Sequence, residues 1–290
     1  MPRHTVEVLQ HLQHTDGVLV TVESVEGSGP REKGAWMAVF PNTLVNTIGG
    51  GHLEFQAIDE ARALLLQKPD VAQQKTSTVS ASPHSQPLTH AHASYALRYA
   101  LGPALGQCCG GVVHLRYTRI TSADASSLKQ QLLSAAQPLT LFGGGHVGKA
   151  LIQVLGNLPF SVHWVDSRDE IFPSQLPINV VCEHSDPVQA AVADLPPQSA
   201  VLIMSFSHAE DLDVVAACLK RQREHNDVRY IGLIGSKTKW ATFRHRLEAR
   251  GFTEQELAFV TCPIGVPGIT GKEPEVIAVA VAAQLLQLPT

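Results

Sequence analysis

The stretch Leu139-Thr-Leu-Phe-Gly-Gly-Gly-His-Val-Gly-Lys149 decides how the second half of the chain folds. It reads as a short buried strand, a glycine turn and the start of a helix. Gly143, Gly145 and Gly148 have the G-x-G-x-x-G spacing, in which glycines permit a tight turn, the approach of a phosphate and close helix packing. His146 lies in the same turn. The first N–H groups of such a helix, with the positive end of its dipole, favour an anion.

An acidic residue follows at a distance that completes this pattern. Asp166 comes 18 residues after Gly148 and ends an apolar run. In dinucleotide-binding folds an acid at this place accepts hydrogen bonds from a ribose hydroxyl. Strand, glycine turn, helix and acid in this order predict a Rossmann-type half, with NAD or another nucleotide as its ligand. A turn that packs the sheet and binds nothing is the alternative, because fold and ligand are separate claims.

The remainder of the second half alternates strands with helices. The apolar runs 200–204 and 230–234 read as strands buried on both faces, which is typical of a parallel, doubly wound sheet. We therefore expect a Rossmann-like domain over residues 138–290. Polar groups follow these two strands, at the edge where such sheets bind their ligands. They are His208, Asp211, Ser236 and Lys237. His208 could act as an acid, a base or a hydrogen-bond donor, or it could be a solvated histidine beside a helix cap.

The first half has a different pattern, with glycine loops between short strands. We expect an α/β domain over residues 1–118 and a polar, Ser/Ala-rich linker over 119–137. One glycine loop is Gly27-Ser-Gly-Pro-Arg31, and a second runs from Asn46 to Glu54 into a helix. By spacing alone, this second loop is as well explained by a tight turn as by an anion-binding loop. Cys109 stands directly before Gly110 and Gly111, on a backbone that can approach a ligand closely.

The composition places the chain among globular proteins, because 44% of the 290 residues are apolar and 17% are charged. The net charge is −4 and the charges are scattered, which argues against nucleic acid as the main partner. The sequence shows neither a signal-peptide pattern nor an apolar run that could span a bilayer, so we expect a cytoplasmic protein with no membrane partner. The five cysteines form no C-x-x-C pair, which favours reduced thiols.

The two glycine loops, the Cys109-Gly-Gly111 run, the terminal Pro263-Ile-Gly265 run and the G-x-G-x-x-G turn together strongly resemble the XdhC/CoxI family of xanthine dehydrogenase accessory proteins. The resemblance implies an N-terminal α/β domain of XdhC/CoxI type before the Rossmann-like domain. It also implies a molybdenum-cofactor chaperone rather than an enzyme. Such a protein binds the molybdopterin-based cofactor, guards its terminal sulfur ligand and passes it to apo xanthine dehydrogenase. A cysteine desulfurase is the implied upstream partner.

By position, the resemblance assigns cofactor-binding roles to residues of both halves, while the glycine turn adds Gly143, Gly145, His146, Gly148 and Asp166. The residues that match the family motifs are Ser28, Arg31, Gly49, Gly50, Gly51, Glu54, Cys109, Gly110, Gly111, His208, Asp211, Ser236 and Lys237. Arg31 and Lys237 offer cations to an anionic cargo, and Cys109 is the natural contact for molybdenum or its sulfur because thiolate suits this metal. The family often has a second histidine where this chain has Phe206.

Two alternative functions come from other classes. A nicotinamide-dependent oxidoreductase is supported by the Rossmann pattern, in which Asp166 favours NAD over NADP, and His208 with Asp211 is its candidate catalytic pair. A nucleotidyl transferase acting on the cofactor would need a carboxylate pair for magnesium, and none stands in a glycine loop. We also expect a homodimer, from unmatched sheet edges and from the family resemblance.

Overall fold

The computed structural model describes residues 2–67, 94–101, 110–134 and 136–289. These residues form two compact units that divide between Leu132 and Leu133. Each unit has a sheet and its own hydrophobic core, so each is described by itself. The expected combination of an N-terminal α/β domain and a C-terminal Rossmann-like domain is confirmed.

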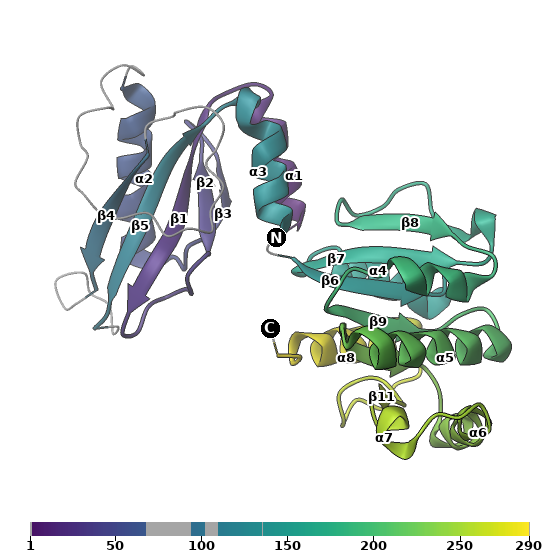
Figure 1. The fold of residues 1–290 in the computed structure, drawn as a ribbon. Coiled ribbons are helices and arrows are strands. Elements are labelled where there is room, and N and C mark those ends of the chain that lie inside the picture. The colour runs from purple at the N-terminus through teal and green to yellow at the C-terminus, as the bar shows by residue number, and fades with distance from the viewer. Residues whose placement is uncertain (1, 68–93, 102–109, 135, 290) are drawn as a thin grey trace. The chain divides into compact units, whose positions relative to one another are not determined.

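The first unit is built on a five-stranded antiparallel sheet with the order β3-β2-β1-β5-β4. Its strands are β1 (Gly17–Glu26), β2 (Trp36–Val39), β3 (Leu44–Asn46), β4 (Ser94–Ala100) and β5 (Val112–Ile120). Its helical segments are α1 (Pro2–Leu12), α2 (Gly51–Leu66), η3 (Ser122–Asp124) and α3 (Ala125–Ser134). Figure 1 shows α2 on one side of this sheet and α1 with α3 on the other.

The two faces of the first sheet carry separate cores because successive strand residues point to opposite sides. On one face, Val18, Val20 and Leu115 pack with the buried side of α2. On the other face, Leu19 and Trp36 pack with apolar residues of α1 and α3. The long pairing of β1 with β5, from Gly17 opposite Ile120 to Glu26 opposite Val112, sets where the loops at the end of β1 lie.

The stretch expected to be a linker is largely part of the first unit. Leu128 and Leu132 of α3 are buried against α1 and the first sheet, together with Val8 and Leu12. The polar composition of residues 119–137 conceals this role because only two side chains of the short helix are needed to bury it. The connection between the units is therefore shorter than the sequence indicated.

The second unit is built on a six-stranded parallel sheet with the order β11-β10-β9-β6-β7-β8. Its strands are β6 (Gln137–Phe142), β7 (Phe160–Asp166), β8 (Val180–His184), β9 (Ser199–Ile203), β10 (Val228–Leu233) and β11 (Val260–Thr261). Its helices are α4 (His146–Leu155), α5 (His208–His225), α6 (Lys237–Glu248), α7 (Glu254–Leu257) and α8 (Pro274–Leu286), with the 3-10 segments η4 (Asp169–Ile171) and η5 (Val188–Asp194).

Helices cover both faces of the second sheet, which explains why its central strands are rich in apolar residues. One face packs against α4 and α8, and the other packs against α5, α6, α7 and η5. From β6 the chain proceeds outward through β7 to β8, and then returns to β9 and proceeds outward through β10 to β11. The order therefore reverses between β6 and β9, and ligands of doubly wound sheets bind at such a switch point.

Candidate functional site

Three loops of the first unit meet where β1 ends and β5 begins. We name them the loop cluster, which consists of residues 27–31, residues 47–51 and the described pair Gly110 and Gly111. A Cβ atom on Gly111 would lie 2.3 Å from the carbonyl oxygen of Ser28 and 2.6 Å from that of Glu26. The first and third loops are thus in backbone contact, which only glycine permits at position 111.

The second loop packs against the first. A Cβ atom on Gly49 would lie 2.6 Å from Pro30 Cβ and 3.2 Å from Arg31 Cγ. Gly49, Gly50 and Gly51 all have positive φ, at 121°, 74° and 69°. Arg31 Nη1 donates to the carbonyl oxygen of Thr47 at 3.4 Å, which ties the two loops together. Motif residues that lie up to 84 positions apart, from Gly27 to Gly111, are therefore gathered in one place.

Glu54 organises the second loop from inside. Its Oε2 atom accepts hydrogen bonds from the N–H groups of Ile48 at 3.0 Å and Gly50 at 3.1 Å, and from the Thr47 hydroxyl. The Thr47 hydroxyl in turn accepts from the N–H of Gly49 at 3.0 Å. Glu54 thus holds donors that the sequence offered to an anion, and it serves the shape of the loop. The first N–H groups of α2 still have no acceptor within the helix.

Two glycines of the loop cluster have space beside them. Among the described residues, and apart from the neighbours along the chain, no heavy atom lies within 4 Å of the Cβ positions of Gly50 and Gly110. A ligand could approach the described backbone at these two glycines, and Arg31 would supply positive charge to the loop cluster. Cys109, predicted to contact molybdenum or sulfur, lies outside the described residues.

In the second unit, the G-x-G-x-x-G turn has the predicted geometry. Gly143 has φ 119°, and a Cβ atom there would lie 2.0 Å from the carbonyl oxygen of Met204, which follows β9. A Cβ atom on Gly148 would lie 2.2 Å from the carbonyl oxygen of Gly143, so α4 packs directly on the turn. Gly145 has open space beside it, and His146 is exposed at the first position of α4. The middle glycine is therefore the one that a ligand could approach.

Asp166 is buried, with 1% of its surface exposed, and closes the turn from the end of β7. Its Oδ2 accepts from the Gly144 N–H at 2.5 Å and from Arg168 Nη2 at 2.9 Å. Its Oδ1 accepts from Arg168 N at 2.9 Å and Nε at 2.8 Å. Burial alone would raise the pKa of this carboxyl, but the hydrogen bonds from Arg168 and Gly144 outweigh it, so the pKa is lowered. Asp166 is thus a carboxylate whose partners lie within the protein.

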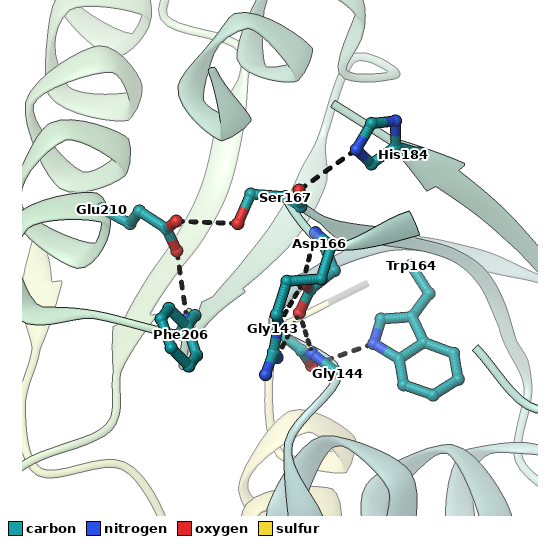
Figure 2. Close-up of polar contacts among 9 residues, drawn as sticks. Gly143, Gly144, Trp164, Asp166, Ser167, His184, Phe206 and Glu210 are labelled. Atoms are coloured by element: carbon teal, nitrogen blue, oxygen red, sulfur yellow. Dashed lines mark hydrogen bonds and ion pairs between the residues drawn. The ribbon is translucent and has the colours of Figure 1, made fainter. Parts of the chain in front are cut away.

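Arg168 also joins β7 to the loop after β9. Its guanidinium carbon lies 4.6 Å from the centroid of the Phe206 ring. The N–H of Phe206 donates to Glu210 Oε2 at 3.1 Å, and Ser167 Oγ donates to Glu210 Oε1 at 2.7 Å. Figure 2 shows Glu210 reaching from α5 toward Ser167, with Phe206 beside it and the Gly143–Gly144 turn next to Asp166. These contacts link the two strands that flank β6.

The two motif residues of α5 lie in different surroundings. His208 is exposed, and its ring centroid is 6.3 Å from that of Phe243. Asp211 is buried, where its Oδ1 accepts from the Ser205 N–H at 2.7 Å and its Oδ2 pairs with Lys239 Nζ at 2.5 Å. The cation that meets Asp211 is therefore Lys239, the second cation of the loop after β10, and not Lys237, which matches the family motif.

The Gly-Ser-Lys loop after β10 is shaped as a helix cap. The Ser236 hydroxyl accepts from the N–H of Lys239 at 3.1 Å, which caps α6, and Lys237 at the first helical position is exposed. Cys262 follows β11, and its Sγ lies 3.9 Å from the carbonyl oxygen of Ser236. Burial and the nearby Asp211 raise the pKa of the Cys262 thiol to about 11, although Lys239 opposes the shift. This cysteine is a neutral thiol at pH 7.

Several residues that shape the site are not among the predicted site residues. Thr47, Arg168, Glu210 and Lys239 each make contacts that hold a predicted residue in place. For Arg168 and Lys239 a signal was present, because each is a cation within six residues of a strand end. Glu210 gave no comparable signal, since an acid in the first turn of a helix is common.

Two kinds of site are absent from the part of the chain that the structure describes. Its residues include no group of three or more His, Cys, Asp or Glu side chains placed to hold a metal ion. Among the same residues, no helix is both long and apolar enough to cross a membrane.

Comparison with known families and proteins gives matches over both units. The model of the XdhC Rossmann domain matches residues 139–285, about half of the chain, and that of the XdhC and CoxI family matches residues 11–73. The chain is 25% identical over 280 residues to an Escherichia coli K12 protein named uncharacterized protein YqeB, which covers 95% of this chain and 44% of that protein. The chain thus spans less than half the length of this relative.

Among solved structures, a Bacillus halodurans protein described as a xanthine dehydrogenase has a similar fold. The TM-score is 0.68 at 19% identity, and the alignment covers 98% of this chain and 95% of that one. At this identity the similarity concerns the fold alone.

Proposed function

The chain belongs to the XdhC and CoxI family, and from this premise we propose that it is a molybdenum-cofactor chaperone for xanthine dehydrogenase. Membership of the family connects the chain with the maturation of that enzyme. In the proposed role the chain binds the mature cofactor as cargo, protects the terminal sulfur ligand of the metal and passes the cofactor to apo xanthine dehydrogenase. A cysteine desulfurase is proposed as the partner that supplies the sulfur, and the chain acts as a homodimer.

The observation that carries the proposal is the loop cluster. Three loops that bear the family motifs converge. The register of β1 with β5 already brings Gly111 beside Ser28, whereas the contact of Gly49 with Pro30 joins two loops that lie outside the strand pairs of the described residues. Among the described residues, no atom other than those of chain neighbours lies within 4 Å of the Cβ positions of Gly50 and Gly110, which supports a role in cradling a ligand.

The chemistry of the cluster is compatible with an anionic cargo. The cofactor carries a phosphate and an anionic metal–oxo group, and Arg31 with the first N–H groups of α2 would attract negative charge. Glu54 already occupies two loop N–H groups, which limits how strongly the cluster holds an anion. A moderate affinity suits a chaperone, because the cargo must be released. Cys109 is proposed as the transient contact for the metal or its sulfur.

The test is analysis of the small molecules and metals that the purified protein carries. Protein isolated from molybdenum-replete cells should contain molybdenum and a pterin in matched, substoichiometric amounts. Cys109→Ala and Arg31→Ala should lose both, and neither variant should activate apo xanthine dehydrogenase. Arg62→Ala, at an exposed arginine of α2, and Cys182→Ala, at the second sheet, are the matched controls and should keep the cargo. Full pterin content in Cys109→Ala and Arg31→Ala would contradict the proposal.

An NAD-dependent oxidoreductase is the second candidate function. It is favoured by the G-x-G-x-x-G turn with open space beside Gly145, at the point where the strand order of the sheet reverses. Binding of NAD⁺ by itself does not separate the candidates, because a chaperone could use a nucleotide for regulation. The separating measurement is turnover, followed as NADH formation at 340 nm with xanthine and other reduced substrates. Sustained turnover that survives removal of molybdenum would favour the oxidoreductase.

A further inference from the structure

Asp166, the acid that the sequence predicts as the ribose-binding residue, has no free position at which its carboxylate could accept another hydrogen bond. A carboxylate offers about four lone-pair positions. Four N–H donors point at Asp166, one from Gly144 and three from Arg168, at distances between 2.5 and 2.9 Å. With 1% of its surface exposed, Asp166 can meet a hydroxyl only if Arg168 leaves. The carboxylate that usually accepts hydrogen bonds from a ribose in a Rossmann fold is therefore occupied by donors of the protein itself.

Glu210, a second carboxylate at the same edge of the sheet, can still accept further hydrogen bonds. Glu210 accepts one hydrogen bond at each oxygen, from Ser167 Oγ and from the N–H of Phe206. About half of its acceptor positions are thus in use. It is half-buried at the start of α5 and faces the residue directly after Asp166 (Figure 2). Glu210 therefore has acceptor positions left for hydroxyl donors of a ligand at this edge of the sheet.

A flat surface lies next to this carboxylate. The Phe206 ring is 67% exposed, which is unusual for so large an apolar side chain. It stacks on the guanidinium of Arg168, which Asp166 holds in a fixed plane through two side-chain hydrogen bonds. Aromatic rings and guanidinium planes both stack on nucleobases. The pair offers a purine a rigid platform at the switch point between β6 and β9.

We propose that the second unit binds an adenine nucleotide with a free ribose diol, whose base stacks on the Arg168–Phe206 pair and whose hydroxyls donate to Glu210. The phosphates lie toward Gly145 and the start of α4. Asp166 pairs with Arg168 and neutralises its charge, whereas Glu210 has only uncharged hydrogen-bond donors, so Glu210 would repel a phosphate on the 2′ oxygen. This inference does not rest on the proposed chaperone function, because it concerns a different unit and a different ligand.

Isothermal titration calorimetry of the full chain with ADP, NAD⁺ and NADP⁺ tests the inference. ADP and NAD⁺ should bind, and NADP⁺ should bind about tenfold more weakly or worse. Glu210→Gln should weaken ADP about tenfold, since a hydrogen bond to a charged acceptor is lost, and should narrow the gap between NAD⁺ and NADP⁺. Phe206→Ala should weaken all three nucleotides about fivefold through loss of stacking.

Glu224→Gln, in the last turn of the same helix, is the matched control and should leave all three affinities unchanged. Should Glu210→Gln fail to fold, Glu210→Asp retains the charge but withdraws the carboxylate by one methylene, and it must weaken ADP as well. Absence of binding by millimolar ADP overturns the inference. The inference is also overturned if Asp166→Asn removes the preference for NAD⁺ over NADP⁺ and Glu210→Gln does not.

Discussion

Lys239 Nζ lies 2.5 Å from Asp211 Oδ2, and their side chains are only 11% and 3% exposed. The pair joins the first turn of α6 to the first turn of α5. The same ammonium group donates to the carbonyl oxygen of Ile234 at 2.8 Å, and the same carboxylate accepts from the Ser205 N–H at 2.7 Å. Both charges are therefore satisfied by the loops that follow β9 and β10.

Breaking this pair from one side should strongly destabilise the second unit. Lys239→Met leaves Asp211 buried without its counter-charge, and such a loss costs about 3–5 kcal/mol. The free energy of unfolding, from urea titration followed by circular dichroism, measures it. Lys237→Met is the matched control, because Lys237 is exposed two residues away and should change stability by less than about 0.5 kcal/mol. If the two substitutions change the free energy of unfolding equally, the ion pair does not stabilise the second unit.

The glycines of the turn after β6 should differ sharply in their tolerance of alanine. Gly143→Ala places a methyl group 2.0 Å from the Met204 carbonyl oxygen in a backbone with φ 119°, so β6 and β9 would be forced apart. We expect a protein that is insoluble or melts far below wild type. Gly145→Ala has open space and a φ of −68°, so it should keep the melting temperature. A folded Gly143→Ala variant with unchanged melting would contradict this geometry.

The same comparison applies to the loop cluster of the first unit. Gly111→Ala would bring a methyl group within 2.3 Å of the Ser28 carbonyl oxygen, whereas Gly110→Ala meets no atom within 4 Å among the described residues other than its chain neighbours. Gly111→Ala should therefore separate the first loop from β5, lower the melting temperature and abolish pterin retention. Gly110→Ala should fold normally. Differential scanning fluorimetry with pterin analysis on the same samples distinguishes the two, and normal melting of Gly111→Ala would rule out the close approach.

Asp166 should make part of the stability of the second unit depend on acid pH. Its pKa in the folded state is lowered from the ordinary 3.8, because hydrogen bonds from Arg168 and Gly144 outweigh the effect of burial. The folded state thus binds the proton more weakly than the unfolded state, so the stabilisation is present above about pH 4 and is lost as pH falls through the folded pKa.

The variant that shows this is Asp166→Asn, which keeps the shape and removes the charge. It should be less stable than wild type by about 2 kcal/mol near pH 7, and the difference should shrink as the pH falls below about 4. Urea titrations at pH 7, 5 and 3 measure it. A difference that stays constant over this range would mean that the carboxylate charge does not contribute.

The sequence was sufficient for the features that depend on local order along the chain. The strand, glycine turn and helix from Leu139 to Lys149 follow from residue types at adjacent positions, and the parallel sheet follows from the alternation of apolar strands with helices. The family motifs are equally local, and the family and the fold class that they predicted are confirmed. Whether those motif residues bind the cofactor stays a prediction.

The partners of the charged groups were decided only by the tertiary structure. Lys237 and Lys239 both follow the same strand, but the rotation of α6 turns Lys239 toward Asp211 and leaves Lys237 in solvent. Glu210 meets Ser167 because β9 and β7 flank β6, although the two residues are 43 positions apart. Gly49 and Pro30 likewise come into contact only because the fold brings their two loops together. The spacing of residues in the sequence specifies which backbone turns can form. The partner of each side chain depends on which strands and helices become neighbours in the folded protein.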